Sequence, residues 1–228
     1  MNEQVKSRRR VADHGEVFTA EREVKAMCDL VDNECNRIDS RFLEPACGDG
    51  NFLAEILSRK LACSEMKRYR KLAFDWERKS LLALGSLYGV DILADNAQRC
   101  RERLYEIWEK EYADVCKNEC NEDTKKSARF ILERNIVCGN ALTLMCVDER
   151  QQDTDEPIVF SEWTLPFNNA NMQRKDYTMA ELLSASEKPA KTKKAKQLSL
   201  FADEEKEAEP TLKKEWEMKH YRRLWDND

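Results

Sequence analysis

The sequence predicts an α/β domain in which a parallel sheet is flanked by helices, followed by a flexible C-terminal tail. Helical patterns of apolar residues alternate with short apolar runs from about residue 16 to residue 163. Parallel strands need crossover connections, and these are usually helices. The length of 228 residues fits one domain of about 165 residues, here residues 15–180, with additional segments on either side.

The first elements form a helix, a strand, a turn and a second helix. Residues 1–14 are polar and are expected to be a flexible N-terminus. Apolar residues at helical spacing, after Thr19 as a candidate N-cap, predict a helix over Glu21–Val31. A short strand is expected at Phe42 and Leu43, and a glycine-containing turn leads from it into a helix over residues 53–61.

The later elements continue this alternation. Helices are expected over residues 66–87, 94–116 and 127–134, and strands over residues 87–91, 135–140 and near residue 157. Residues 181–214 have the composition of a charged linker, with lysines before and acidic residues after the motif QLSLF. Residues 215–228 contain Trp216, Tyr221 and Trp225, which favours a short docking helix.

Charge and cysteine content limit the function classes. The net charge of −5 argues against a purely electrostatic nucleic-acid binder, although residues 59–79 hold eight basic against three acidic residues. That segment is either a phosphate-binding patch or, as we favour, a solvated helix face. Nine cysteines without a CxxC pair, a signal peptide or a long apolar run predict a cytoplasmic, metal-free protein with reduced thiols.

Polar groups stand at the end of each expected strand. Gly48 and Gly50 would let the backbone approach a ligand, and the following helix N-terminus presents free N–H groups. Asp91 ends the second strand and Asn140 the third, and the carboxyl ends of parallel strands are where a doubly wound sheet binds nucleosides. Turn formation or helix capping by Asp91 and Asn140 is the alternative; we favour the nucleoside site.

These residues carry a family resemblance. FLEPACGDGNFL, residues 42–53, resembles the S-adenosylmethionine (SAM) motif of adenine-N6 DNA methyltransferases from restriction-modification systems. GEVFT at residues 15–19, GVDI at 89–92 and CGNAL at 138–142 are similar to neighbouring motifs of that family, in the same order. The resemblance implies a Rossmann-like, SAM-dependent methyltransferase fold.

The resemblance also implies a set of SAM-binding residues. Glu44 and Gly48 would face the methionine moiety, Asp91 the ribose hydroxyls, and Ile92 and Asn140 the adenine ring and its amino group. The residues before the first helix would close over the sulfonium. The complete set is Phe18, Thr19, Glu44, Ala46, Gly48, Gly50, Asn51, Asp91, Ile92 and Asn140.

The family's catalytic loop is missing. An Asn/Asp-Pro-Pro-Tyr/Phe tetrapeptide normally accepts the hydrogens of the target amino group and stacks on the flipped base, and none occurs in these 228 residues. Ser161 or Glu162 as acceptor and Trp163 or Phe167 as stacking ring are weak substitutes. Only about 60 residues follow the expected fourth strand, and many of them are linker-like, so the fold is expected to be incomplete, with an exposed sheet edge that the tail or another chain covers.

The motifs and the resemblance lead to two main functional hypotheses and to several expected partners. The first is a SAM-binding methyltransferase acting on adenine N6 in DNA; the second is a catalytically silent SAM-binding or structural subunit of a modification system. A third, less favoured hypothesis is a methyltransferase that acts on another small substrate. DNA contacted through a partner, and a methyltransferase or specificity subunit, are the expected macromolecular partners.

The QLSLF motif suggests one more partner. It resembles the peptide with which bacterial repair proteins dock on the DNA sliding clamp, and the alternative is a cluster that packs back on the core. The residues concerned are Gln197, Leu198, Leu200 and Phe201.

Overall fold

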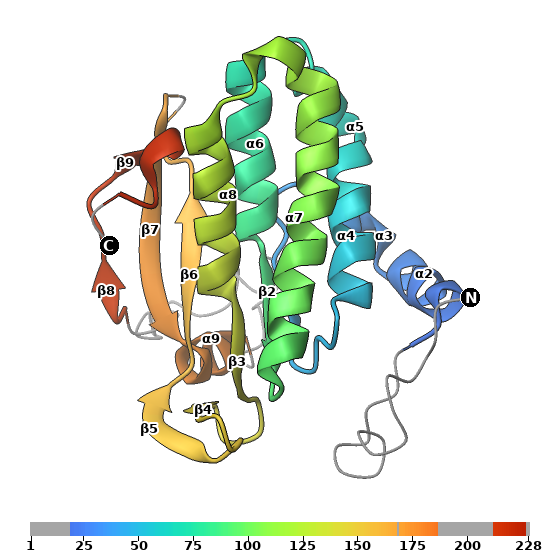
Figure 1. Ribbon diagram of the computed structural model, residues 1–228. Coiled ribbons are helices and arrows are strands. Elements are labelled where there is room, and N and C mark those ends of the chain that lie inside the picture. Colours follow the sequence, from blue (N-terminus) through green and yellow to red (C-terminus); the bar gives the residue numbers. More distant parts are fainter. Residues whose placement is uncertain (1–18, 168, 187–211, 227–228) are drawn as a thin grey trace, which may run out of the picture.

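The computed structural model describes residues 19–167, 169–186 and 212–226 (Figure 1). Residues 1–14, the segment 15–18 with Phe18, and the QLSLF motif lie outside the described residues, so the expectations for them stay predictions. The α/β class is confirmed: helices pack on a sheet of five strands in the order β1-β2-β3-β4-β5.

The sheet is mixed, which corrects the expectation of a parallel one. The strands are β1 (Phe42–Glu44), β2 (Leu87–Asp91), β3 (Ile136–Asn140), β4 (Met145–Val147) and β5 (Asp153–Pro157). The first three are parallel, as expected, whereas β4 and β5 are antiparallel additions. The chain reverses directly after β3, where the Leu144 N–H donates to the Asn140 carbonyl and Leu144 has a φ of 64°. Without a crossover helix, the next strand must run antiparallel.

The helices lie mainly over one face of the sheet (Figure 1). They are α2 (Glu21–Leu30), α3 (Asp32–Cys35), α4 (Asn51–Ala62), α5 (Ser64–Tyr69), α6 (Ala73–Gly85), α7 (Ala94–Cys116) and α8 (Glu122–Asn135), with the 3-10 turn η1 (Lys117–Glu119) between the last two. The helix α7 has the expected bounds. The helix α8 begins earlier than expected because the Asn121 side chain accepts from the N–H groups of Asp123 and Thr124, which caps its first turn.

The prediction of a single helix over residues 66–87 is wrong, because the helical structure is interrupted between α5 and α6. Leu72 has extended backbone angles and forms the N-cap of α6. Arg70, in the break, pairs with Glu111 and Asp114 of α7 at 3.0 and 2.7 Å. These long-range ion pairs hold the turn, and periodicity within the segment could not reveal them.

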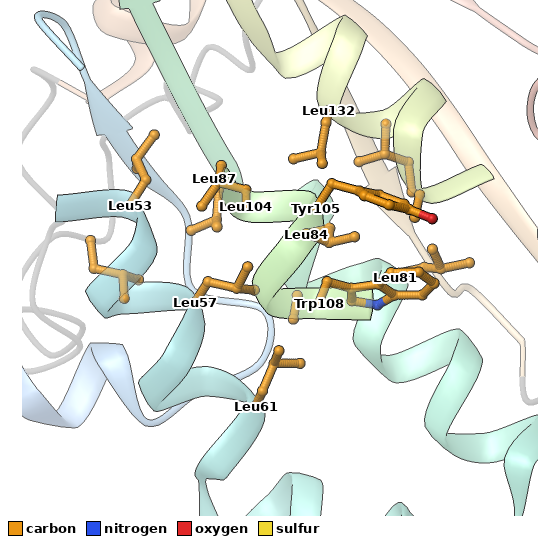
Figure 2. Packing of buried hydrophobic residues seen from close by; sticks show 14 of the residues in the cluster. Leu53, Leu57, Leu61, Leu81, Leu84, Leu87, Leu104, Tyr105, Trp108 and Leu132 are labelled. Atoms are coloured by element: carbon orange, nitrogen blue, oxygen red, sulfur yellow. The ribbon is translucent and has the colours of Figure 1, made fainter. Parts of the chain in front are cut away.

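The main core lies between the sheet and the helices. Figure 2 shows Leu53, Leu57 and Leu61 of α4 aligned at intervals of one turn and facing side chains of α6, α7 and β2. Aromatic rings extend the core away from the sheet, with Trp76 stacked on Tyr112 at a centroid distance of 5.7 Å. Packing of this face therefore fixes α4, whose N-terminus follows the glycine-containing turn.

A second, smaller core lies on the opposite face. Side chains of β2 alternate between the two faces: Leu87 packs in the main core, whereas Tyr88 and Val90 join Ile158 and Phe160 in the small one. Phe160 belongs to β6 (Val159–Thr164) and Met179 of the same core to the helix α9 (Met179–Ser186), and β7 (Asn171–Thr178) connects these two elements. The expected fourth strand is thus present as β6, but it forms an antiparallel hairpin with β7.

The C-terminal segment differs from the expected helix. Instead of a helix over residues 215–228, β8 (Lys214–Glu215) and β9 (Lys219–His220) pair with β7, and a single 3-10 turn η2 (Tyr221–Arg223) follows. Pairing with β7 satisfies the backbone polar groups of these residues, which removes the need for helical hydrogen bonds. The turn η2 packs against α8 (Figure 1).

Candidate functional site

A cavity of about 970 Å³ opens at the carboxyl ends of β1, β2 and β3. The segments that follow these strands line it: residues 43–49, 91–93 and 139–142. All described residues with an implied role in SAM binding line this cavity, except Gly50, which is buried at the end of the loop after β1. The volume is at the upper end of the range for small-molecule sites.

The loop after β1 depends on its two glycines. Gly48 and Gly50 have φ values of 53° and 87°, a region that side-chain-bearing residues rarely adopt. A Cβ on Gly50 would also lie 2.7 Å from the Cys100 sulfur. The Cys47 N–H donates to the Val90 carbonyl at 2.8 Å, so the loop folds back on the end of β2. The resulting bend leaves the N-terminus of α4 beside the cavity.

Asp91 ties three elements together at the centre of the site. One carboxylate oxygen accepts from the Gly48 N–H at 2.9 Å, and the other accepts from the Leu93 N–H and the Asn96 amide at 2.9 and 3.2 Å. The side chain thus has the structural role considered as an alternative, and it also borders the cavity. A carboxylate has about four lone-pair positions, so one remains for a ribose hydroxyl.

Asn140 makes a turn and lines the cavity at the same time. Its side-chain oxygen accepts from the Leu142 N–H and its amide donates to Asp153, both at 3.0 Å. The amide is therefore oriented, with its oxygen toward the turn. That oxygen keeps a second lone pair for an amino group, which is the role that the resemblance implies.

Glu44 is the acidic group of the cavity wall beside Asp91. Burial raises the pKa of Glu44, and a hydrogen bond from the Ala46 N–H at 3.4 Å partly offsets this shift. Ionisation of Glu44 is consequently disfavoured unless a cation lies nearby. A ligand with an ammonium or sulfonium group would supply that cation.

A polar network connects the chain before α2 to the site. Asn51 at the start of α4 donates to the Thr19 carbonyl at 3.3 Å and accepts from Arg103 of α7 at 2.6 Å. Arg103 also lies 3.5 Å from Asp49. Thr19 thereby reaches the cavity rim, as expected, and the arginine that orients Asn51 was not predicted, because α7 approaches α4 only in the folded chain.

The weak catalytic candidates do not lie in the cavity. Ser161 is 1% exposed and donates to Asp176, Glu162 pairs with Arg41 at 2.9 Å, and Trp163 packs on Gly85. Phe167 is exposed and does not line the cavity either. The reason is the antiparallel direction of β6, which carries these residues away from the carboxyl ends of β1 to β3.

Four residues of the described cavity wall lie outside the motifs quoted for the resemblance: Leu93, Asn96, Met179 and Leu183. Asn96 follows Asp91 by five residues and lies in the first turn of α7. A polar residue at this position of the sequence could have indicated that it lies beside Asp91. Leu93 follows Asp91 by two residues and donates its N–H to that carboxylate. Met179 and Leu183 come from α9, and no local pattern reveals them because the β6–β7 hairpin brings α9 back to the sheet.

The basic segment over residues 59–79 is not part of this cavity. Arg59 pairs with Asp29, Asp32 and Glu55, and the buried Lys60 ammonium donates to three backbone carbonyls before β1. With the ion pairs of Arg70, this favours structural and solvated roles over a phosphate-binding patch. Within the described ranges, no helix has both the length and the apolar character needed to cross a bilayer.

The chemistry of the described cavity wall suits the binding and orientation of a ligand. The described cavity wall combines the N-terminus of α4 with three carboxylates, three side-chain amides and apolar side chains. This combination is suited to binding and orienting a ligand with a sugar and a base.

Comparison with known families agrees with this arrangement. The model of the MmeI DNA-methyltransferase domain matches residues 20–198, which extends well beyond the motifs at residues 15–145. No curated protein and no solved structure matches the chain. Because the match covers most of the sequence, the chain belongs to the MmeI DNA-methyltransferase domain family, a family of the restriction-modification type.

Proposed function

We propose that the protein binds SAM in the cavity at the ends of β1, β2 and β3, within a Rossmann-like half-sheet. The observation that carries this proposal is the convergence of Gly48, Asp91 and Asn140 from three separate strand ends on one cavity. The implied ligand fits the groups present: the N-terminus of α4, a carboxylate with a remaining lone pair, and an amide oxygen. We further propose methyl transfer to adenine N6 in DNA as the reaction.

The residues of the chain act by binding and orientation. Glu44 offers a negative charge to the methionine end, and Asp91 and Asn140 hold the sugar and the base. When bound, SAM supplies the electrophilic methyl group. A target amino group needs hydrogen-bond acceptors beside that methyl group. Among the described residues of the cavity wall, we assign this acceptor role to none.

Calorimetric titration with SAM tests the binding site. We expect saturable binding by the wild type and at least a ten-fold loss of affinity for Asp91→Ala, since one hydrogen bond from a charged group and the support of the loop are lost. Asp155→Ala, an exposed carboxylate of β5 outside the cavity wall, is the matched control and should bind normally. Absence of heat with the wild type would refute the proposal.

A second candidate function is a SAM-binding subunit that requires a partner. It is favoured by the edge of the sheet: among the described residues, β1 pairs with β2 alone, and Leu43 is 36% exposed beside the cavity. In doubly wound sheets the ligand lies where the strand order reverses, with strands on both sides. A methyltransferase or specificity subunit that adds a strand to β1 and carries the missing tetrapeptide would complete the site.

Transfer of labelled methyl groups to DNA separates the two functions. Transfer by the purified chain alone supports the enzyme and excludes the need for a partner. If the chain binds SAM without transferring methyl, the subunit function holds. In that case, Leu43→Lys should block activation by an added protein that carries the tetrapeptide, because a charge at this exposed edge position opposes strand pairing.

A further inference from the structure

The helix α9 is fixed in position at the start of β6. Its first turn has a reciprocal cap: the Thr178 N–H donates to the Glu181 carboxylate at 2.8 Å, and the Glu181 N–H donates to the Thr178 hydroxyl at 3.3 Å. The Met179 N–H donates to the Ile158 carbonyl at 2.9 Å, which ties α9 to the residue before β6. The helix is therefore held by the fold before any ligand binds.

Two side chains of α9 form part of the cavity wall. Met179 and Leu183 are four residues apart and so lie on one face of the helix. Met179 is 2% exposed within the small core, and Leu183 packs partly against the same core. Ala141, next to Asn140, also contacts this core and lines the cavity. The apolar face of α9 thus adjoins the turn that presents the Asn140 amide.

From this arrangement we infer that α9 supplies the apolar wall for the nucleobase of the bound nucleoside. A purine has two apolar faces and a polar edge, so it needs an apolar surface close to a hydrogen-bonding group. The turn after β3 and α9 provide both, through Asn140 on one side and through Met179 and Leu183 on the other. Leu183 is then a specificity-determining residue for the purine, in an element outside the motifs of residues 15–145.

This inference rests on the proposed nucleoside site and is tested by titration with two ligands. SAM carries both a purine and an amino acid, whereas 5′-methylthioadenosine keeps the purine and lacks the amino acid. Leu183→Ala should weaken both by a similar factor of about ten, because it removes the same apolar contact from each. Leu183→Met should restore most of the affinity, since it refills the volume.

Leu182→Ala is the matched control. Leu182 also packs on the small core but does not line the cavity, so this variant should lower thermal stability to a similar degree and leave affinity within about two-fold. Unchanged affinity of Leu183→Ala for both ligands, or a loss confined to SAM, would overturn the inference. If the wild type binds SAM and Asp91→Ala does not, that result would leave the proposed function intact. A wild type that binds neither ligand would remove both.

Discussion

Asp91 has a structural role in the loop and, under the proposed function, a binding role through the same carboxylate. It holds Gly48 of the loop after β1 and the first turn of α7, so the shape of the cavity depends on it before a ligand is present. Replacement of this residue should therefore affect the position of the loop as well as the contact with a sugar. Asp91→Asn keeps the volume but replaces one acceptor oxygen by an NH2 donor, which must face either the Gly48 N–H or the Leu93 N–H, so it should be almost as harmful as Asp91→Ala.

The ionisation of Glu44 determines how the proposed SAM binding should depend on pH. Its pKa is raised by burial, so the carboxyl takes up a proton as the pH falls through that raised value. A bound ligand with net positive charge favours the ionised form and lowers the pKa again. Affinity should therefore rise with pH through the raised pKa and become constant above it.

Titrations that begin near the ordinary glutamate pKa of about 4.3 and extend to higher pH measure this effect. Glu44→Gln should remove most of the dependence, because the amide does not titrate. Ionisation of Glu44 in the free protein opposes folding, so the same variant should be less sensitive to rising pH in its free energy of unfolding. An unaltered affinity profile in Glu44→Gln would contradict the role of this carboxylate.

Single residues of the site were predictable where their position follows from the local chain. Gly48, Asp91 and Asn140 each stand at the end of a short apolar run, and strand ends of a parallel sheet meet at one edge. The orientation of Ser161 and Trp163 could not be predicted in this way, because it depends on which direction β6 takes. The same holds for Leu183, which reaches the cavity only through the hairpin.

At the scale of elements, the C-terminal turn η2 is held by a buried acid of α6. Glu77 is 0% exposed and accepts from the hydroxyl groups of Tyr112, Thr124 and Tyr221, and from the guanidinium of Arg222 at 2.7 Å. An unpaired buried carboxylate is costly, so these donors are required together. The 144 positions between Glu77 and Tyr221 explain why no local pattern predicted the contact.

Arg222→Ala should destabilise the protein by about 2 kcal/mol, allowing for the partial exposure of the arginine. Urea denaturation followed by far-UV circular dichroism measures the loss. Arg223→Ala, at an exposed neighbouring position, should change the free energy of unfolding by less than about 0.5 kcal/mol. Equal effects of the two substitutions would show that the ion pair with Glu77 does not stabilise the fold.

The predicted bounds of an element are correct where residues within the segment itself determine its structure. The bounds of β2 and α7 follow from apolar runs and helical periodicity inside each segment. Failures occur at Leu72 and over residues 214–223, where partners far along the chain decide. Ion pairs of Arg70 break the expected helix, and pairing with β7 makes the C-terminal segment extended.

At the scale of the whole molecule, two regions have different proposed ligands. SAM is proposed for the cavity at the ends of β1, β2 and β3, and the sliding clamp for the segment over residues 187–211. That segment connects α9 to β8 in the sequence and contains QLSLF, which lies outside the described residues. We propose that this motif binds the bacterial sliding clamp. A pull-down should recover the clamp with the wild type and lose it with Leu200→Ala/Phe201→Ala.

The double variant Lys193→Ala/Lys194→Ala, in the same segment but outside the motif, is the control and should still bind the clamp. Loss of binding in both double variants would indicate attraction by charge. Binding that survives Leu200→Ala/Phe201→Ala would assign the contact to another surface.

Chemical-shift mapping with SAM tests the central claim most directly. Backbone amide spectra of the labelled protein should show saturable shifts at Gly48, Asp91 and Asn140, with the Glu77 and Tyr221 signals unchanged. These three residues are far apart in the sequence and meet only at the carboxyl ends of β1, β2 and β3. No saturable shifts, or shifts confined to residues outside this cavity, would contradict the account.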